Sequence, residues 1–138
     1  MIVVNKVLTL TSTNRRELID ITREVLDFTR EQNVTNGTCT VSAPHATAAI
    51  IANENESGLR RDLLAKIEEL FPQSGEYAHN AIDDNADSHV AAAFLGHSTT
   101  FPIVNGRLVR GTWQNIFLVE LDGPRSHREV YLQIMGES

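Results

Sequence analysis

Short turns join strand-like segments in the last third of the chain, and this feature restricts the fold most. Residues 101–104 (FPIV) and 107–111 (RLVRG) flank Asn105-Gly106, a dipeptide that favours a two-residue hairpin with a type I′ turn. Residues 114–121 (QNIFLVEL) and 128–135 (REVYLQIM) flank DGPRSH, which predicts another turn. Because a two-residue hairpin joins antiparallel neighbours, we expect an antiparallel sheet.

The first third of the chain predicts a strand followed by a helix. Residues 3–10 have the composition of a strand, although a lysine interrupts their apolar face. Asn14 and Glu17 match a capping box, and the apolar residues that follow recur at helical spacing. We therefore expect a helix over residues 13–32. Its buried stripe would comprise Leu18, Ile21, Val25 and Phe28.

The middle of the chain alternates between predicted strands and helices. Residues 38–43 alternate between polar and apolar side chains, and residues 46–54 are apolar enough to form a buried strand. Residues 57–71 and 87–96 have the composition of helices. Strands joined by turns, with helices between the earlier ones, predict one α+β domain over residues 1–138. Its centre would be an antiparallel sheet or sandwich.

The charge balance excludes some classes of partner. The chain of 138 residues carries a formal net charge of −6, whereas nucleic-acid and anionic membrane surfaces attract clustered Lys and Arg. We expect no nucleic-acid partner and no membrane partner. The sequence has no long apolar run and no basic leader, and the single Cys39 has no internal disulfide partner. These features predict a cytoplasmic protein.

Residues 77–98 concentrate side chains that could bind a metal. The segment holds His79, His89, His97, Asp83, Asp84 and Asp87, and it has no Lys or Arg. Imidazole is a good ligand for zinc and similar metals, so His79 and His89 are candidate ligands. Asp87 could orient His89 or act as a base. The alternative is structural, because Asn85 or Asp87 could simply cap the helix that follows.

Other candidates lie outside this segment. His45 is in a loop between two predicted strands, where a rigid support can present a side chain, although a surface histidine is the alternative. Thr112 and Gln114 flank the only tryptophan, Trp113, and could face a ligand. Trp113 itself is expected in the core or an interface. Arg125 lies in a predicted turn and could clamp an anion, including one bound by a neighbouring subunit.

Several blocks of sequence occur in the order typical of a known family. They are GTCTVSAPHATAAIIANEN, LRRDLLAKIEELFP, YAHN and NADSHVAAAFLGHSTTFPIVNGRLVRGTWQNIFLVELDGPR, which together cover most of the chain. In this order the chain strongly resembles the YjbQ-like family, whose members are described as secondary thiamine-phosphate synthase enzymes. The resemblance is firm from about Gly37 to the end of the chain.

The resemblance implies a fold, an assembly and a site. The fold would be a β-sandwich, jelly-roll-like, with flanking helices, and the chain would assemble as a homotrimer. His45, His79 and His89 match histidines that lie close together in a cleft able to hold a divalent metal. Zinc is expected first, with nickel or magnesium as alternatives. Asp87, Gln114 and Arg125 match the family's other blocks and are candidate catalytic residues.

The activity implied by the resemblance joins a hydroxymethylpyrimidine diphosphate to a thiazole phosphate and releases pyrophosphate. Departure of pyrophosphate needs stabilisation by cations, a role that a metal and Arg125 could share. The substrate would thus be a phosphorylated small molecule. Two alternatives stay open at this point. One is a metal-dependent hydrolase with Asp87 as its base, and the other is a non-catalytic trimeric module that binds an anion or a partner.

Overall fold

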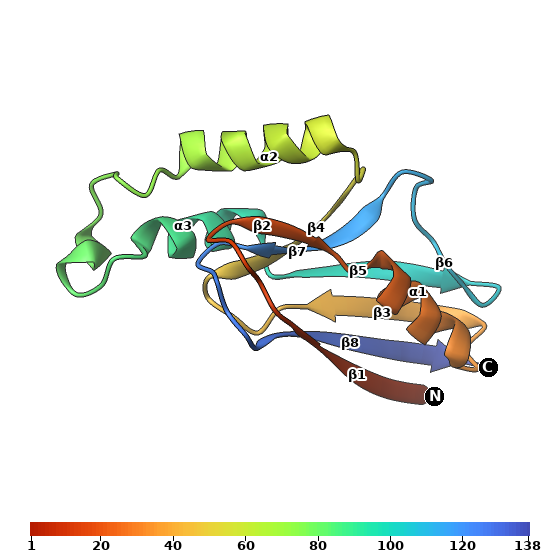
Figure 1. The fold of residues 1–138 in the computed structure, drawn as a ribbon. Helices are drawn as coiled ribbons and strands as arrows, with labels where there is room; N and C mark the ends of the chain where they lie inside the picture. Colours follow the sequence, from red (N-terminus) through yellow and green to blue (C-terminus); the bar gives the residue numbers. More distant parts are fainter.

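Two antiparallel sheets form most of the structure, a computed structural model that describes residues 1–138 (Figure 1). The larger sheet has five strands in the order β1 (Ile2–Leu10), β8 (Arg128–Glu137), β3 (Asn36–Ser42), β5 (Ser98–Val104) and β6 (Arg107–Leu108). The smaller sheet has three strands in the order β2 (Glu17–Asp20), β7 (Asn115–Glu120) and β4 (Ala48–Asn53). Every strand pair in both sheets is antiparallel, as the turns in the sequence predict.

Helices complete the fold. They are α1 (Thr22–Glu31), α2 (Ser57–Leu70), the short 3₁₀ helix η1 (Ala78–Ala81) and α3 (Ala86–Leu95). Figure 1 shows α2 and α3 on the side of the smaller sheet that faces away from the larger sheet. None of the helices is long and apolar enough to cross a membrane. The predicted α+β class is confirmed, whereas the jelly-roll form of the sandwich stays a prediction.

The main core lies between the two sheets. Because side chains alternate along a strand, each strand contributes every second residue to it. The inward-facing residues include Cys39 and Val41 of β3, Leu132 and Ile134 of β8, and Ile116 and Leu118 of β7, all 0% exposed. Burial of each of the larger apolar side chains contributes about 1.5–3 kcal/mol to stability. These contacts hold the two sheets in a fixed relative position.

A second apolar cluster lies between the smaller sheet and the helices. Phe117 and Val119 of β7 face it, together with Ile67 of α2 and Ala91 of α3. The guanidinium of Arg60 lies over the Phe117 ring, 5.6 Å from its centroid. β7 is therefore buried on both faces, which explains why its sequence is apolar without alternation.

The predicted hairpin at Asn105-Gly106 is confirmed. Asn105 has a φ of 53° and Gly106 a φ of 76°, as both central residues of a type I′ turn require. Val104 of β5 pairs with Arg107 of β6 directly across the turn. The dipeptide alone was sufficient to locate this turn.

The predicted helix over residues 13–32 is wrong in its first half. β2 occupies part of this segment, and Leu18 pairs with Val119 of β7. The carboxylate of Glu17 does accept a hydrogen bond from the backbone N–H of Asn14, at 3.1 Å, as in a capping box. Here the contact closes a bend that precedes β2. The backbone groups of β2 find their hydrogen-bond partners in β7, so the segment does not need to form a helix to satisfy them. Only the second half, α1, is helical.

Residues 122–127 connect the two sheets, so the predicted turn does not join hairpin partners. β7 pairs with β2 and β4, whereas β8 pairs with β1 and β3. The crossing passes close to the chain that follows β1. A Cβ atom on Gly123 would lie only 2.2 Å from the carbonyl oxygen of Asn14, so this position needs glycine for the close approach.

Candidate functional site

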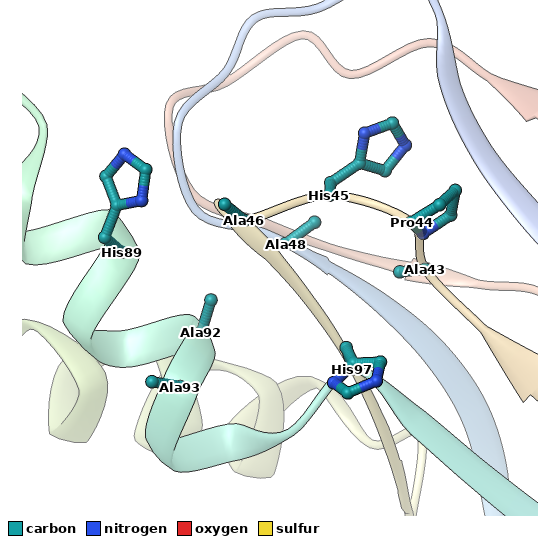
Figure 2. Close-up of a pocket in the computed structure, with 9 residues that line it drawn as sticks. All are labelled: Ala43, Pro44, His45, Ala46, Ala48, His89, Ala92, Ala93 and His97. Atoms are coloured by element: carbon teal, nitrogen blue, oxygen red, sulfur yellow. The ribbon is translucent and has the colours of Figure 1, made fainter.

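A cleft of about 480 Å³ lies between α3 and the loop that joins β3 to β4 (Figure 2). Three histidines line it: His45 from the loop, His89 from α3 and His97 from the segment after α3. The other lining residues are Ala43, Pro44, Ala46, Ala48, Ala92 and Ala93. Small side chains leave the volume that larger ones would fill. The imidazoles are therefore the only groups in the lining that can titrate or bind a metal.

Backbone hydrogen bonds fix the floor of this cleft. The N–H of Ala43 donates to the carbonyl oxygen of His97 at 2.8 Å, and the N–H of Ile50 donates to that of Gly96 at 3.0 Å. Gly96 has a φ of 93°, ends α3 and directs the chain into β5. His97 is thus held beside the end of β3 by the strand that follows it.

His79 and His89 lie close together, as the resemblance implies. Their ring centroids are 4.8 Å apart, and the rings meet edge to face at 64°. His79 belongs to η1 and His89 to α3, so the turn between these helices sets the distance. His79 Nε2 lies 3.2 Å from the side-chain oxygen of Asn85, which therefore accepts a hydrogen bond from the ring.

A chain of hydrogen bonds connects His79 with Arg125. The amide nitrogen of Asn85 donates to Asp122 at 2.8 Å, and Arg125 Nη2 donates to the same carboxylate oxygen at 3.0 Å. Arg125 is exposed in the crossing segment between β7 and β8, and these contacts orient it. Two predicted site residues that are 46 positions apart are thereby linked through Asn85 and Asp122.

Asp87 is fully buried and binds two arginines. Its carboxylate accepts hydrogen bonds from Arg15 at 2.9 and 3.1 Å and from Arg16 at 2.6 Å. Burial raises the pKa of Asp87, but the hydrogen bonds and charges of Arg15 and Arg16 outweigh it and lower the pKa below its ordinary value. A carboxylate held in this way is a weak base. The structure therefore favours Asp87 as an anchor for the first turn of α3.

Neither predicted helix cap is made by the expected side chain. Asn85 occupies the N-cap position of α3, but its side chain makes no capping hydrogen bond. The side chain of Asn80 instead accepts a hydrogen bond from the N–H of Ala86 at 3.2 Å. The countercharge that residues 77–98 lack comes from Arg15 and Arg16, far away in the sequence.

His45 is oriented by β8. Its Nε2 accepts a hydrogen bond from the backbone N–H of Glu129 at 2.9 Å. Burial, together with the positive charge of Arg128, lowers the pKa of His45, so the ring is neutral at pH 7 and carries its proton on Nδ1. In Figure 2 the ring points away from His89.

The three histidines predicted as metal ligands do not form one cluster in this conformation. No group of three or more His, Cys, Asp or Glu side chains is placed to hold a metal ion. His79 and His89 fit as a pair of ligands because their rings are adjacent. His45 does not fit, since its Nε2 already accepts the Glu129 N–H.

Gln114 lies far from the histidines. β4 and β7 are antiparallel, with Ala48 opposite Glu120 and Asn53 opposite Asn115. Gln114 is therefore at the other end of the smaller sheet from the His45 loop, on the order of 20 Å away at the usual rise per residue. Its side-chain oxygen accepts the N–H of Gly111 at 2.6 Å and closes a local turn. Gln114 and His45 cannot belong to one site within a single chain.

Trp113 is exposed, with 70% of its surface accessible. The prediction of a core tryptophan is wrong for the single chain, because Trp113 lies in the exposed turn of residues 111–114 that precedes β7. That Trp113 lies in an interface between subunits stays a prediction.

Four residues of this region were not identified from the sequence: Arg15, Arg16, Glu120 and Asp122. The lack of Lys and Arg in residues 77–98 did indicate that a countercharge was needed. Nothing local could identify it, because the arginines are 71 and 72 positions from Asp87. Glu120 lies in an apolar strand, where a single carboxylate gave no functional signal.

The structure is thus an α+β protein with a histidine-lined cleft beside its smaller sheet. Residues 6–137 match the family model described as "UPF0047 protein YjbQ-like", and the chain belongs to this family. The resemblance seen in the sequence is confirmed.

Relatives span nearly the same length as this chain. A UPF0047 protein of Methanothermobacter thermautotrophicus is 48% identical over 121 residues, which are 88% of this chain and 85% of the relative. UPF0047 protein YugU of Bacillus subtilis is 39% identical over 132 residues, 95% of this chain and 98% of the relative. Neither description states a reaction.

Solved structures have the same fold. The crystal structure of a "YbjQ-like protein of unknown function" from Sulfolobus solfataricus P2 superposes with a TM-score of 0.96 at 48% identity, and 98% of each chain is covered. A hypothetical protein of Aeropyrum pernix K1 gives a TM-score of 0.92 at 38% identity, with 96% of this chain and 98% of that chain covered.

Proposed function

We propose that this protein is a small-molecule enzyme that transfers a group between phosphorylated substrates and releases pyrophosphate, as thiamine-phosphate synthase does. The observation that carries the proposal is the cleft in which His45, His89 and His97 are the only titratable lining residues. Neutral imidazoles can donate to, and accept protons from, a substrate bound among small apolar side chains. Arg125 lies on the far side of His45, where positive charge would stabilise a departing anion.

A divalent metal, zinc before nickel or magnesium, is part of this proposal. His79 and His89 would hold it, since their rings are adjacent. Such an ion would supply a positive charge for developing negative charge on phosphate oxygens. In the conformation described here His45 acts differently, as a neutral donor through Nδ1–H. Asp87, with Arg15 and Arg16, would fix the helix that presents His89.

We also propose that the chain assembles as a homotrimer. Two observations support self-association: Trp113 is 70% exposed, and the outer face of the larger sheet presents Val3, Val7, Tyr131 and Met135. Light scattering at micromolar concentration should give the mass of three chains. A monomer mass would contradict this part of the proposal.

The activity test uses purified protein with hydroxymethylpyrimidine diphosphate and thiazole phosphate, in the presence of zinc, nickel or magnesium. We expect release of pyrophosphate, reduced at least ~100-fold in His89→Gln, a loss within the usual contribution of one acid–base group. Arg61→Ala, on the exposed side of α2, serves as the control and should be unaffected. Equal turnover in His89→Gln and wild type would contradict the assigned site.

Two further measurements separate the alternatives. Metal content should fall in His79→Ala and His89→Ala but not in Arg61→Ala; wild-type metal content in both histidine variants would remove the ligand assignment. A panel of single phosphorylated metabolites tests hydrolysis, which needs no second substrate. Saturable binding with no turnover of any substrate would favour the non-catalytic module.

A further inference from the structure

A second cavity lies on the other side of His45. Its volume is about 260 Å³, and its lining residues are His45, Arg125, Ser126, His127 and Arg128, none of them apolar. His45 also lines the histidine cleft, so its ring and loop form a wall between the two. The second cavity is therefore placed to bind one part of a molecule whose other part lies in the cleft.

Arg128 presents a rigid, partly unused guanidinium to this cavity. Its side chain is only 4% exposed and is fixed by Glu120 and by the oxygens of Thr47, through Nε and Nη2. Nη1 makes no hydrogen bond within the chain. Nη1 of Arg128 is not fully buried, because the only fully buried side-chain nitrogen without a hydrogen-bond partner is Nε of Arg16. Nη1 thus keeps some accessible surface, and this cavity is the only one that Arg128 lines.

The other unused groups around the cavity are also donors. Arg125 binds Asp122 through Nε and Nη2, which leaves Nη1 free. The backbone N–H groups of Ser126 and His127 have no partner within the chain. The neutral ring of His45 carries its proton on Nδ1, because Nε2 accepts from Glu129. Of the nearby carboxylates, Glu120 and Asp122 are already paired with Arg128 and Arg125. Glu129, which follows Arg128, has no ion-pair partner but does not line the cavity.

We propose that the cavity formed by His45 and residues 125–128 is a binding subsite for a phosphate or pyrophosphate group. Several unpaired N–H donors on the lining residues, with no carboxylate in the lining, match an anion with several oxygens, and guanidinium forks match phosphate geometry. Assigning the anion to the substrate rests on the proposed function, whereas the anion site itself does not.

Titration calorimetry with inorganic pyrophosphate tests the site directly. Wild-type protein should bind pyrophosphate saturably, and Arg125→Gln should weaken binding roughly ten-fold or more, as expected for loss of a charge-assisted hydrogen bond. Arg107→Gln is the matched control, because Arg107 lies in β6, at the opposite end of the molecule from this cavity. Absence of saturable binding in wild type, or equal weakening in Arg107→Gln, would overturn the proposal.

Two more variants sharpen the test. Arg128→Lys keeps the charge beside Glu120 but deletes Nη1, so a folded variant should lose affinity about as much as Arg125→Gln. If Arg128→Lys does not fold, His127→Gln on the exposed wall takes its place and should weaken binding severalfold. Unchanged affinity in the folded variants would overturn the proposal.

The anion site and the proposed reaction can fail separately. In His89→Gln, pyrophosphate binding should persist while turnover is lost, because His89 does not line this cavity. Competition then identifies the source of the anion. A phosphorylated substrate that displaces pyrophosphate from wild type shows that its own phosphate occupies the site. Tight pyrophosphate binding without such competition supports the anion site and contradicts its assignment to the substrate.

Discussion

The two ends of β7 differ in how their polar groups are held. At the Glu120 end, a fully buried carboxylate binds Arg128 and the hydroxyl of Ser12, and Arg128 in turn binds Thr47. At the Gln114 end, the Gln114 side chain makes a hydrogen bond only within a local turn, and Trp113 extends into solvent. The first end has fixed geometry before any ligand arrives, as a binding site requires. Although Asp20 holds Asn115 at 2.7 Å, the turn before it is exposed and can adapt to another surface.

The buried pair at the Glu120 end is costly to maintain. Two charges leave water, and their attraction offsets that cost only with good geometry and extra hydrogen bonds. Burial raises the pKa of Glu120, but hydrogen bonds from Arg128 and Ser12 lower it overall, so the carboxylate stays ionised. An apolar pair of similar size could give equal stability. The ion pair is better explained by what it positions, which is the guanidinium beside His45.

The largest effect should come from Glu120→Ala. This variant leaves Arg128 buried without a countercharge and should lower the free energy of unfolding by about 3–5 kcal/mol. Urea denaturation at pH 7 measures the loss. The matched variant at the other end, Gln114→Ala, should differ from wild type by about 0.5 kcal/mol or less. Similar losses in the two variants would remove the contrast between the ends of β7.

Asp87→Asn should have an intermediate effect that depends on pH. It deletes the charge that holds Arg15 and Arg16 and should cost about 2–3 kcal/mol at pH 7. Because the folded-state pKa of Asp87 is depressed, its stabilisation is complete above the unfolded value of about 3.9 and is lost as the pH falls through the folded value. Urea midpoints of wild type and variant should therefore converge below about pH 4.

A conservative control separates charge from packing at this site. Ser88→Ala removes one hydrogen bond from Arg15 and one to the carbonyl of Leu121 but leaves the carboxylate intact. Its cost should not depend on pH between 3 and 7. A constant difference between Asp87→Asn and wild type across that range would show that the carboxylate contributes no charge-dependent stability.

The smallest effect on the stability of the isolated chain should come from Trp113→Ala. With most of the indole in solvent, we expect a change within about 0.5 kcal/mol. Association is a different measurement, and light scattering of the variant should show weaker assembly if the turn contacts another subunit. A loss of 2 kcal/mol or more in a monomeric sample would mean that the ring packs against its own chain.

Local signals in the sequence were sufficient for some elements and insufficient for others. Asn105-Gly106 specified its turn because both residues must adopt positive φ, and few other dipeptides do so easily. Residues 13–20 carried the capping box and the apolar spacing of a helix, yet they form a bend and β2. The deciding partner, β7, lies about 100 positions away, beyond the reach of any local pattern.

In the candidate site too, the sequence identified local contacts and missed those between distant segments. The sequence and the family resemblance identified His79 and His89 as neighbours, and a short turn between two helices makes that arrangement local. The arginines that bind Asp87, and the contact between His45 and Glu129, join segments from opposite parts of the chain. Such contacts depend on how the sheets pack, so the role of Asp87 and the orientation of His45 required the structure.

The lone Cys39 gives the native protein a built-in reporter. Its side chain is 0% exposed at the centre of β3, and burial raises the pKa of its thiol to about 11. The thiolate is the form that attacks alkylating reagents, so Cys39 cannot react at neutral pH while β3 stays between β5 and β8. The labelling rate of unmodified protein therefore measures how often the larger sheet opens. A ligand that binds only the closed state should slow labelling in proportion to its occupancy, whether or not it is ever turned over.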